Sequence, residues 1–386
     1  MSKIDEMIER LCPDGVEYKR IDDVCFLKRG KTITKKSSNL GIVPVVAGGR
    51  EPAYYIDKCN CEGQTITIAG SGAYAGHVLF WNEPIWVGDS FSIKTKSEEF
   101  LVSRYLFFVL KNMQNTIYKL KKGSGVPHVK PADIAPIKIP VPPLEIQEEI
   151  VRVLDSFAEL EAELEAELER RKAQYAYYRD RLLEQRASKT YKITDLASYR
   201  RGSFPQPYTN SNFYGGEGAM PFVQVADVAE SGFRLNNQTN QTISAIAQPK
   251  SVFVPKGTII VSLQGSIGRV AITQYDAYVD RTLAIFTSIN KNCLPRYFVY
   301  QLERIFLCKK ETARGITIKT ITKAEFSNFE IPVPSLEEQQ RIVNILDKFD
   351  ALVNDISQGL PAEIEARRKQ YEYYRDKLLT FKEKVN

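Results

Sequence analysis

Residues 139–160 read IPVPPLEIQEEIVRVLDSFAEL and residues 331–352 read IPVPSLEEQQRIVNILDKFDAL, so one block occurs twice in the chain. A second block, QYAYYRDRLL at residues 174–183, returns as QYEYYRDKLL at residues 370–379. The first block is shifted by 192 residues and the second by 196, so the later copy holds four more residues between its blocks. An internal repeat of this size predicts two related structural units.

Each copy of the first block predicts the start of a long helix. Its prolines favour extended backbone before them, and acidic residues follow where a first helical turn would lie. We expect the helices to begin near Pro143 and near Ser335, a candidate N-cap with Glu338 three residues further on. Apolar residues then recur mostly three or four positions apart, which is typical of a helix packed along its length against another. They are Ile150, Leu154, Phe157, Leu160, Leu164, Leu168, Tyr175, Tyr178 and Leu182 in the first copy, and Ile342, Leu346, Phe349, Leu352, Ile356, Leu360, Ile364, Tyr371, Tyr374 and Leu378 in the second.

Between the blocks of the first copy, residues 158–169 read AELEAELEAELE. Four residues are close to one helical turn, so adding or removing a unit changes the helix length by about 6 Å and rotates its end by about 40°. A continuous helix from about 143 to 185 would be roughly 60 Å long. The second copy has Gly359-Leu360-Pro361 instead, which predicts a kink or a short break with Pro361 in the first turn of a new helix.

The segments before the two helices predict mixed strand and helix. We expect short strands at Gln64–Ala69, Ile85–Val87 and Phe91–Lys94, and at Thr258–Leu263, Val270–Thr273 and Leu283–Thr287. Helical stretches follow at Ser103–Tyr118 and Pro295–Cys308. The predicted fold is α+β, with mixed α/β domains at 1–140 and 188–332 separated by two long antiparallel helices at 141–187 and 333–386, related by a pseudo-twofold internal repeat. The segment before Gly15 takes the place that the end of the first helix holds before the second domain, so it is expected to complete the end of the last helix.

Composition excludes several classes of protein. No apolar run approaches the 18 residues that a membrane-spanning helix needs, and Met1–Arg10 is too rich in charge for a signal peptide. Six scattered cysteines and two histidines do not supply a four-ligand zinc site, and we interpret the cysteines as reduced thiols of a cytoplasmic protein. A net charge of +6 permits nucleic-acid binding without requiring it.

No catalytic motif is complete in the sequence. Residues 82–85 lack the second proline and the aromatic residue of an amino-methyltransferase tetrapeptide. The glycines of residues 70–76 miss the spacing of a dinucleotide-binding loop, and Cys25 stands where a phosphate-binding loop ending at residues 30–32 requires glycine. His77 and His128 have no Ser or Cys pattern nearby that would form a triad. We therefore predict no catalytic residue, no metal site and no cofactor in this chain.

Polar and basic residues remain in the expected loops of both domains. Lys and Arg can neutralise phosphates, while Arg, Gln, Ser and Thr can contact base edges. Any one of them is more often a solvated surface charge, but Gly123 and Gly315 match at the 192-residue shift and open corresponding polar loops. The candidate DNA-binding residues are Arg29, Lys31, Arg50, Lys121, Lys122, Ser124, His128 and Lys130 in the first domain, and Arg200, Arg201, Ser203, Gln264, Arg269, Arg281, Arg314, Thr317, Lys319 and Lys323 in the second.

Taken together, these blocks resemble the DNA-specificity subunits of type I restriction-modification enzymes. The resemblance rests on both copies of the first block, on RRKAQYAYYRDRLL and ARRKQYEYYRDKLL, and on the AELE array, and it covers essentially the whole chain. It implies two target-recognition domains that each read one half of a split site in double-stranded DNA, and helices that space them and dock two methyltransferase subunits. It further implies that those subunits bind S-adenosylmethionine and methylate adenine, and that a separate motor-nuclease subunit cleaves unmodified DNA.

The resemblance also implies helix-packing or partner-docking roles for Phe157, Leu160, Leu164, Leu168, Tyr175, Tyr178, Phe349, Leu352, Ile356, Tyr371 and Tyr374. Two other interpretations stay open: a self-contained DNA methyltransferase or nuclease, and a coiled-coil adaptor without DNA specificity. The AELE array is interpreted as the adjustable part of a spacer, or else as a surface helix lengthened by replication slippage without consequence.

Overall fold

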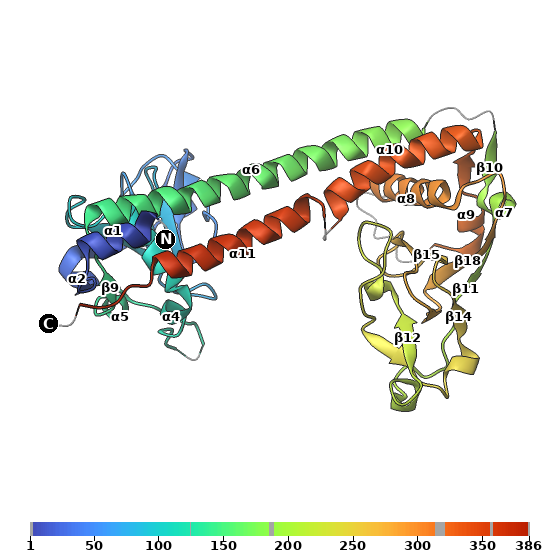
Figure 1. The fold of residues 1–386 in the computed structure, drawn as a ribbon, viewed down its shortest axis with the longest axis horizontal. Coiled ribbons are helices and arrows are strands. Elements are labelled where there is room, and N and C mark those ends of the chain that lie inside the picture. Colours follow the sequence, from blue (N-terminus) through green and yellow to red (C-terminus); the bar gives the residue numbers. More distant parts are fainter. Residues whose placement is uncertain (1–2, 124, 185–188, 313–320, 356–357, 385–386) are drawn as a thin grey trace. The chain divides into compact units, whose positions relative to one another are not determined.

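The computed structural model describes residues 3–123, 125–184, 189–312, 321–355 and 358–384. The chain forms two compact units, a first unit of Met1–Glu163 with Ala366–Asn386 and a second unit of Leu164–Glu365. Each unit joins a mixed α/β domain to segments of the long helices (Figure 1).

The described residues of the first unit form three sheets. A four-stranded antiparallel sheet has the order β2 (Cys25–Arg29), β8 (Ser90–Thr95), β5 (Thr65–Ala69) and β6 (Val78–Trp81). A three-stranded sheet has the order β4 (Tyr55–Ile56), β3 (Val43–Val46) and β7 (Trp86–Val87), in which β3 and β7 are parallel. Strand β1 (Tyr18–Arg20) pairs with β9 (Lys138–Pro140). The short helices are α1 (Lys3–Leu11), α2 (Ile21–Val24), η1 (Lys35–Ser37), α3 (Ser103–Asn112), α4 (Gln114–Tyr118) and α5 (Pro131–Ile134).

The second unit repeats this plan with different lengths. Its four-stranded antiparallel sheet has the order β11 (Ala197–Arg201), β18 (Leu283–Ile289), β15 (Ile259–Ser262) and β16 (Val270–Ile272). Its other sheets are β13 (Gln241–Ile243), β12 (Met220–Val223), β17 (Ala277–Val279) and β14 (Val252–Val254), and the pair β10 (Thr190–Lys192) and β19 (Glu330–Pro332). The short helices are α7 (Ile193–Leu196), η2 (Ser211–Phe213), η3 (Val225–Asp227), η4 (Gln248–Lys250), α8 (Pro295–Thr312) and α9 (Lys323–Ser327).

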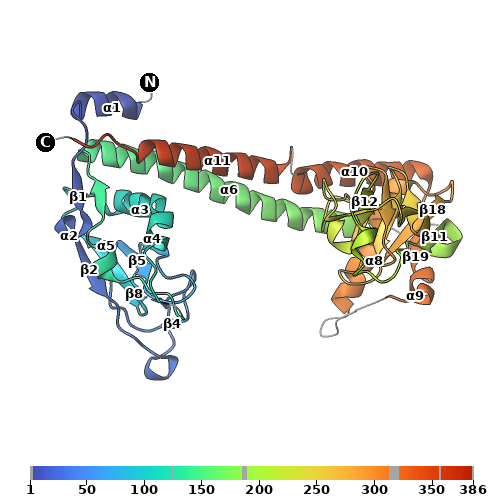
Figure 2. The same ribbon diagram turned by 90° about the horizontal axis from the view of Figure 1, so that it is seen from below.

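The two units therefore share one topology. The sheet β2-β8-β5-β6 corresponds to β11-β18-β15-β16, and the parallel pair of β3 and β7 corresponds to that of β12 and β17. All six strands and both helical stretches expected from the sequence are present within a few residues of their predicted ends. In the first unit α3 lies against β5 and β6 and buries five apolar side chains in their common core; Figure 2 shows α3 near β5.

The long helices begin where the repeated block predicts. Helix α6 (Leu144–Leu183) is continuous over 40 residues and contributes to both units. Helix α10 (Leu336–Asn354) has Ser335 as its N-cap, whose Oγ accepts a hydrogen bond from the Glu338 amide at 3.3 Å. Helix α11 (Leu360–Leu378) starts after a break. A Cβ at Gly359 would lie 2.5 Å from the Ala351 carbonyl oxygen, so the chain needs glycine there to leave one helix and enter the next.

Aromatic side chains from the repeated blocks join the long helices within each unit. In the first unit Phe157 of α6 stacks on Tyr374 and meets the edge of Tyr371, with ring centroids 5.5 and 6.4 Å apart. In the second unit Phe349 of α10 stacks on Tyr178 at 5.6 Å and contacts Tyr175. Six aromatic residues of the repeated blocks thus contact one another between the long helices, three in each unit.

The aliphatic residues predicted for the helix seam differ in how deeply they are buried. Leu168 packs against the core of the second unit, and Leu160 and Leu164 are half-buried. Leu352 is 36% exposed, so it lies at the edge of the seam rather than within it. Ile356 lies outside the described residues.

One buried glutamine fixes each long helix to its domain. Gln147, on α6 of the first unit, accepts a hydrogen bond from the Val102 amide at 2.9 Å and donates to the carbonyl oxygens of Phe100 at 3.0 Å and Pro142 at 2.7 Å. Gln339 on α10 makes the same three bonds, to the Leu294 amide and to two carbonyl oxygens, each at 2.8 Å. Both side chains are fully buried, and they are separated by the same 192 residues as the repeated block.

The ends of the chain meet in the first unit. The Val16 amide donates to the Lys382 carbonyl at 2.8 Å, and the Lys384 amide donates to the Val16 carbonyl at 2.9 Å. The N-terminal segment, which was expected to complete the end of the last helix, thus pairs with the residues that directly follow α11.

Candidate nucleic-acid interface

Several loops of the first unit converge at one end of its sheets. The Gly30 amide donates to the Ser90 carbonyl at 2.9 Å, the Gly88 amide to Val46 at 2.8 Å, and the Val129 amide to Gly70 at 3.0 Å. A Cβ at Gly48 would lie 2.5 Å from the Ser71 carbonyl oxygen, so that loop touches the others too. We call residues 29–31, 47–50, 70–77, 88–90, 119–123 and 125–130 the first loop cluster.

The second unit builds a corresponding surface, the second loop cluster, from residues 200–208, 224–230, 263–269, 279–283 and 321–323. The Gly202 amide donates to the Leu283 carbonyl at 3.1 Å, the Leu263 amide to the Thr282 carbonyl at 2.9 Å, and the Ile321 amide to the Leu263 carbonyl at 3.1 Å. These bonds bring together the ends of β11, β15, β17 and β18. Rigid strands thus hold loops of different sequence, as in many binding proteins.

Matched glycines allow this convergence in both units. A Cβ at Gly30 would lie 2.2 Å from the Gly88 carbonyl oxygen, and one at Gly202 would lie 2.2 Å from the Val279 carbonyl oxygen. The strand that ends at each glycine therefore passes directly over the end of a neighbouring strand. The match between Arg29-Gly30 and Arg201-Gly202 in the sequence reflects this close approach.

All the described basic residues predicted for the first domain fall in the first loop cluster. Arg29, Lys31, Arg50, Lys122, His128 and Lys130 are exposed, and Lys121 is half-buried. Lys121 lies over the Tyr118 ring at 4.4 Å and also donates to the Ala73 carbonyl at 3.2 Å. Lys122 forms an ion pair with Asp133. Ser124 lies outside the described residues.

The surroundings of His77 indicate a positive potential in this cluster. Its Nδ1 lies 2.9 Å from the Tyr118 hydroxyl. Burial, and then the charges of Lys111 and Arg50, lower the pKa of His77 to about 4. The imidazole is therefore neutral near pH 7, and the cations around it favour an anionic partner.

The residues predicted for the second domain differ in how many hydrogen bonds and ion pairs their side chains form within the protein. Ser203 donates to the Lys250 carbonyl at 2.9 Å, and Arg201 contacts the Ile321 carbonyl at 3.5 Å. Arg269 donates to the Val228 carbonyl at 3.0 Å and pairs with Glu230 at 2.6 Å, so it ties two loops together. Arg200 is exposed. Arg314, Thr317 and Lys319 lie outside the described residues, as does the side chain of Lys323, which begins α9.

Gln264 and Arg281 share a shallow depression in the second loop cluster, together with Tyr208, Gln224, Asp280 and Thr282. Asp280 is 3% exposed and accepts hydrogen bonds from the Thr282 amide at 2.9 Å, from the Thr282 hydroxyl at 2.6 Å and from the Tyr208 hydroxyl. Burial and the bond to Asp280 raise the pKa of Tyr208, so its phenol stays a neutral donor. No local sequence pattern points to Tyr208 or Asp280, because their contact spans 72 residues.

The family described as type I restriction modification DNA specificity domain matches residues 13–170 and 186–366. The chain belongs to this family. A putative type I restriction enzyme specificity subunit of Haemophilus influenzae is 29% identical over 382 residues, covering 95% of this chain and 96% of that relative. The EcoR124I/EcoR124II specificity subunit of Escherichia coli is 35% identical over 261 residues, which are 63% of each chain. The S subunit of a type I restriction-modification system from M. genitalium shares the fold, with a TM-score of 0.62 at 16% identity over 95% of this chain and 96% of that one.

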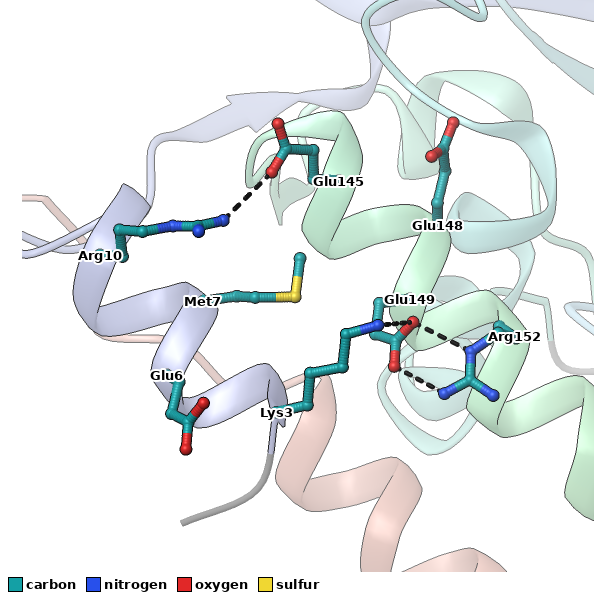
Figure 3. A pocket seen from close by; sticks show the side chains of 8 residues that line it. All are labelled: Lys3, Glu6, Met7, Arg10, Glu145, Glu148, Glu149 and Arg152. Carbon is teal, nitrogen blue, oxygen red and sulfur yellow. Dashed lines mark hydrogen bonds and ion pairs between the residues drawn. The ribbon is translucent and has the colours of Figure 1, made fainter.

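A second feature of this type I specificity subunit is a charged groove between α1 and the start of α6 (Figure 3). Glu149 binds Lys3 Nζ at 3.2 Å and the Arg152 guanidinium at 2.9 and 2.6 Å, and Arg10 pairs with Glu145 at 3.4 Å. The bonds from Arg152, aided by Lys3, lower the pKa of Glu149 to about 2. The folded pKa of Glu149 lies below the unfolded one, so its ion pairs with Lys3 and Arg152 are fully formed above about pH 4 and are lost as the pH falls toward 2.

Two other kinds of site are absent from the part of the chain that the structure describes. There, no helix is long and apolar enough to cross a membrane. In the same residues no group of three or more His, Cys, Asp and Glu side chains is placed to hold a metal ion. The two loop clusters remain the candidate functional surfaces of this specificity subunit.

Proposed function

We propose that each loop cluster reads one half of a bipartite site in double-stranded DNA, and that the chain is the non-catalytic specificity subunit of a type I restriction-modification complex. The observation that carries this proposal is one scaffold built twice with unlike loop residues. Gly88 and Asp89 of the first loop cluster correspond, at the 192-residue shift, to Asp280 and Arg281 of the second. Two surfaces of unlike chemistry should select two different half-sites.

In this proposal, residues 1–140 and 188–332 are the target-recognition domains, and residues 141–187 and 333–386 set their spacing. The continuous helix α6 supports a rigid spacer. Most of the AELE array is exposed, with Leu160, Leu164 and Leu168 half-buried and Glu161 paired with Arg368 at 2.6 Å. A whole unit of four residues can therefore be removed without taking a side chain from either domain core.

Deleting Ala162–Glu165 tests the spacer. The deletion removes about 6 Å of helix, which corresponds to one to two base pairs at about 3.4 Å each. We expect a shorter gap between the half-sites and no change in either half-site, measured by mapping methylated adenines in cells that hold the cognate methyltransferase. The double substitution Ala162→Gln with Glu163→Gln keeps the helix length and should keep the gap. An unchanged gap after the deletion, or altered half-sites, would contradict the spacer.

The proposed partners are two methyltransferase subunits, which dock on the long helices and bring S-adenosylmethionine, and motor-nuclease subunits that join through the complex in the cytoplasm. Membership of the family supports this assembly. The purified chain should then bind DNA with steep salt dependence and a large preference for one bipartite site, and should neither methylate nor cleave it. Methylation or cleavage without partners would identify a self-contained enzyme. Binding that is indifferent to sequence and weakly sensitive to salt would identify an adaptor.

A further inference from the structure

We propose that two arginines, Arg281 in the second loop cluster and Arg50 in the first, each recognise a guanine in the major groove of their half-site. This inference rests on the proposed function and deepens it, because it selects the base-reading residues. Both arginines are exposed, and the guanidinium carbon of each lies over a tyrosine ring. The arrangement holds the guanidinium in place from its face and leaves its donor edge available.

Arg281 has the better-defined support. Its guanidinium carbon lies 5.2 Å from the centre of the Tyr208 ring. The Tyr208 hydroxyl donates to Asp280, which is buried and fixed by two bonds from Thr282. A buried carboxylate thus positions a ring, and the ring positions the arginine. Among the described residues Arg281 makes no hydrogen bond or ion pair, so its donors point to no acceptor within the protein.

Arg50 is held in the same way on a different scaffold position. Its guanidinium carbon lies 4.8 Å from the centre of the Tyr74 ring, in a loop between β5 and β6. Within the part of the chain that the structure describes, its guanidinium also forms no hydrogen bond or ion pair. Arg50 follows β3 whereas Arg281 follows β17, so the two are not equivalent in the repeat. We therefore expect the guanine to occupy different positions in the two half-sites.

Several other cations of the loop clusters, unlike the exposed Arg29 and Arg200, are already engaged by the protein. Arg269 bonds to Val228 and Glu230, Lys122 pairs with Asp133, and Lys121 donates to Ala73. The N–H groups that these side chains would need to bind a base already donate hydrogen bonds within the protein. The two stacked arginines are thus distinguished from their neighbours by both support and available donors.

The chemistry of the guanidinium selects guanine. Its planar fork donates two parallel hydrogen bonds, and guanine presents two acceptors, O6 and N7, side by side in the major groove. Lysine carries the same charge and can still neutralise a phosphate, but it lacks the planar fork that matches guanine O6 and N7 together. The exchange of arginine for lysine therefore separates base recognition from phosphate contact.

The test uses the full chain with its cognate methyltransferase subunits and a DNA library randomised at one half-site at a time. Arg281→Lys should lower the preference for guanine at one base pair by roughly 5- to 150-fold, leaving the other half-site unchanged. Arg50→Lys should do the same in the opposite half-site only. The intact half-site in each variant shows that the protein is folded. Tyr208→Leu should reduce the same guanine preference as Arg281→Lys, because it removes the ring that supports the arginine.

Arg234→Lys, in the same unit but outside the second loop cluster, is the matched control and should change no base preference. A uniform loss of affinity across all sequences, with a smaller salt dependence, would show a phosphate contact and overturn the inference while leaving the bipartite proposal intact. Unchanged preferences in both lysine variants would overturn it as well. A wild-type complex with no bipartite preference would overturn both proposals.

Discussion

Replacing Gln147 by alanine should destabilise the first unit and leave the second unaffected. The amide of Gln147 is fully buried and makes three hydrogen bonds, of 2.9, 3.0 and 2.7 Å, to the backbone around Phe100, Val102 and Pro142. The substitution leaves one buried N–H and two buried carbonyls without their partner. Each buried group left unpaired costs about 1–3 kcal/mol, so we expect the free energy of unfolding to fall by about 3–5 kcal/mol after partial compensation by water.

Hydrogen exchange measured by mass spectrometry can assign this loss to one unit. Amide protection in β5, β8 and α3 should fall in Gln147→Ala, while protection in β15, β18 and α8 stays at its wild-type level. Gln339→Ala should give the opposite pattern, because Gln339 makes the same three bonds in the second unit.

The neighbouring exposed residues provide matched controls. Glu148→Ala and Gln340→Ala change the same helical turns outside the buried contacts, and each should alter the free energy of unfolding by no more than about 0.5 kcal/mol. If Gln147→Ala were as mild as Glu148→Ala, or if both units lost protection together, the account of the glutamine as the fixing contact of one unit would be wrong.

Three further changes test other parts of the structure. Gly30→Ala should lower the free energy of unfolding of the first unit by about 3 kcal/mol, at the upper end of the cost of overpacking, because its Cβ would meet the Gly88 carbonyl oxygen at 2.2 Å. Gly125→Ala is the control, since its Cβ would meet no atom within 4 Å, and it should be near neutral in equilibrium unfolding. Burial raises the pKa of Glu303 to about 7, above its unfolded value of about 4.3, so the second unit should lose stability as the pH rises from about 4 to 7. Glu303→Gln should flatten that dependence and raise the free energy of unfolding at pH 8 by on the order of 2 kcal/mol. Hydrogen exchange measured at several pH values follows this change, and an unchanged slope would contradict the assignment. Phe349→Ala removes the ring that stacks on Tyr178 and should cost about 3 kcal/mol in the unfolding of the second unit, with the exposed Leu352→Ala as the milder control.

Most of the fold could be predicted from the repeated block. Proline spacing, the N-cap at Ser335 and the Gly359-Pro361 break act within one or two helical turns, so their effects follow from local sequence. The partners of Gln147 lie up to 47 residues away, yet the recurrence of Gln339 at the same shift was a signal that could have revealed them.

The binding surfaces were less accessible from the sequence. Basic loop residues could be nominated by type, but only the structure separates Arg281, which is stacked on Tyr208, from Arg269, which is tied to Glu230. That difference depends on contacts between loops 39 to 73 residues apart, which no local pattern encodes. The same is true of Asp280, whose burial follows from the convergence of strand ends.

The function proposed for the two unlike loop clusters is the recognition of two unlike half-sites. Sequencing of methylated adenines in cells that express this chain with its cognate methyltransferase tests it most directly. We predict a single motif made of two different specific half-sites separated by a fixed gap of unspecified bases. A continuous motif or a palindrome would contradict the account.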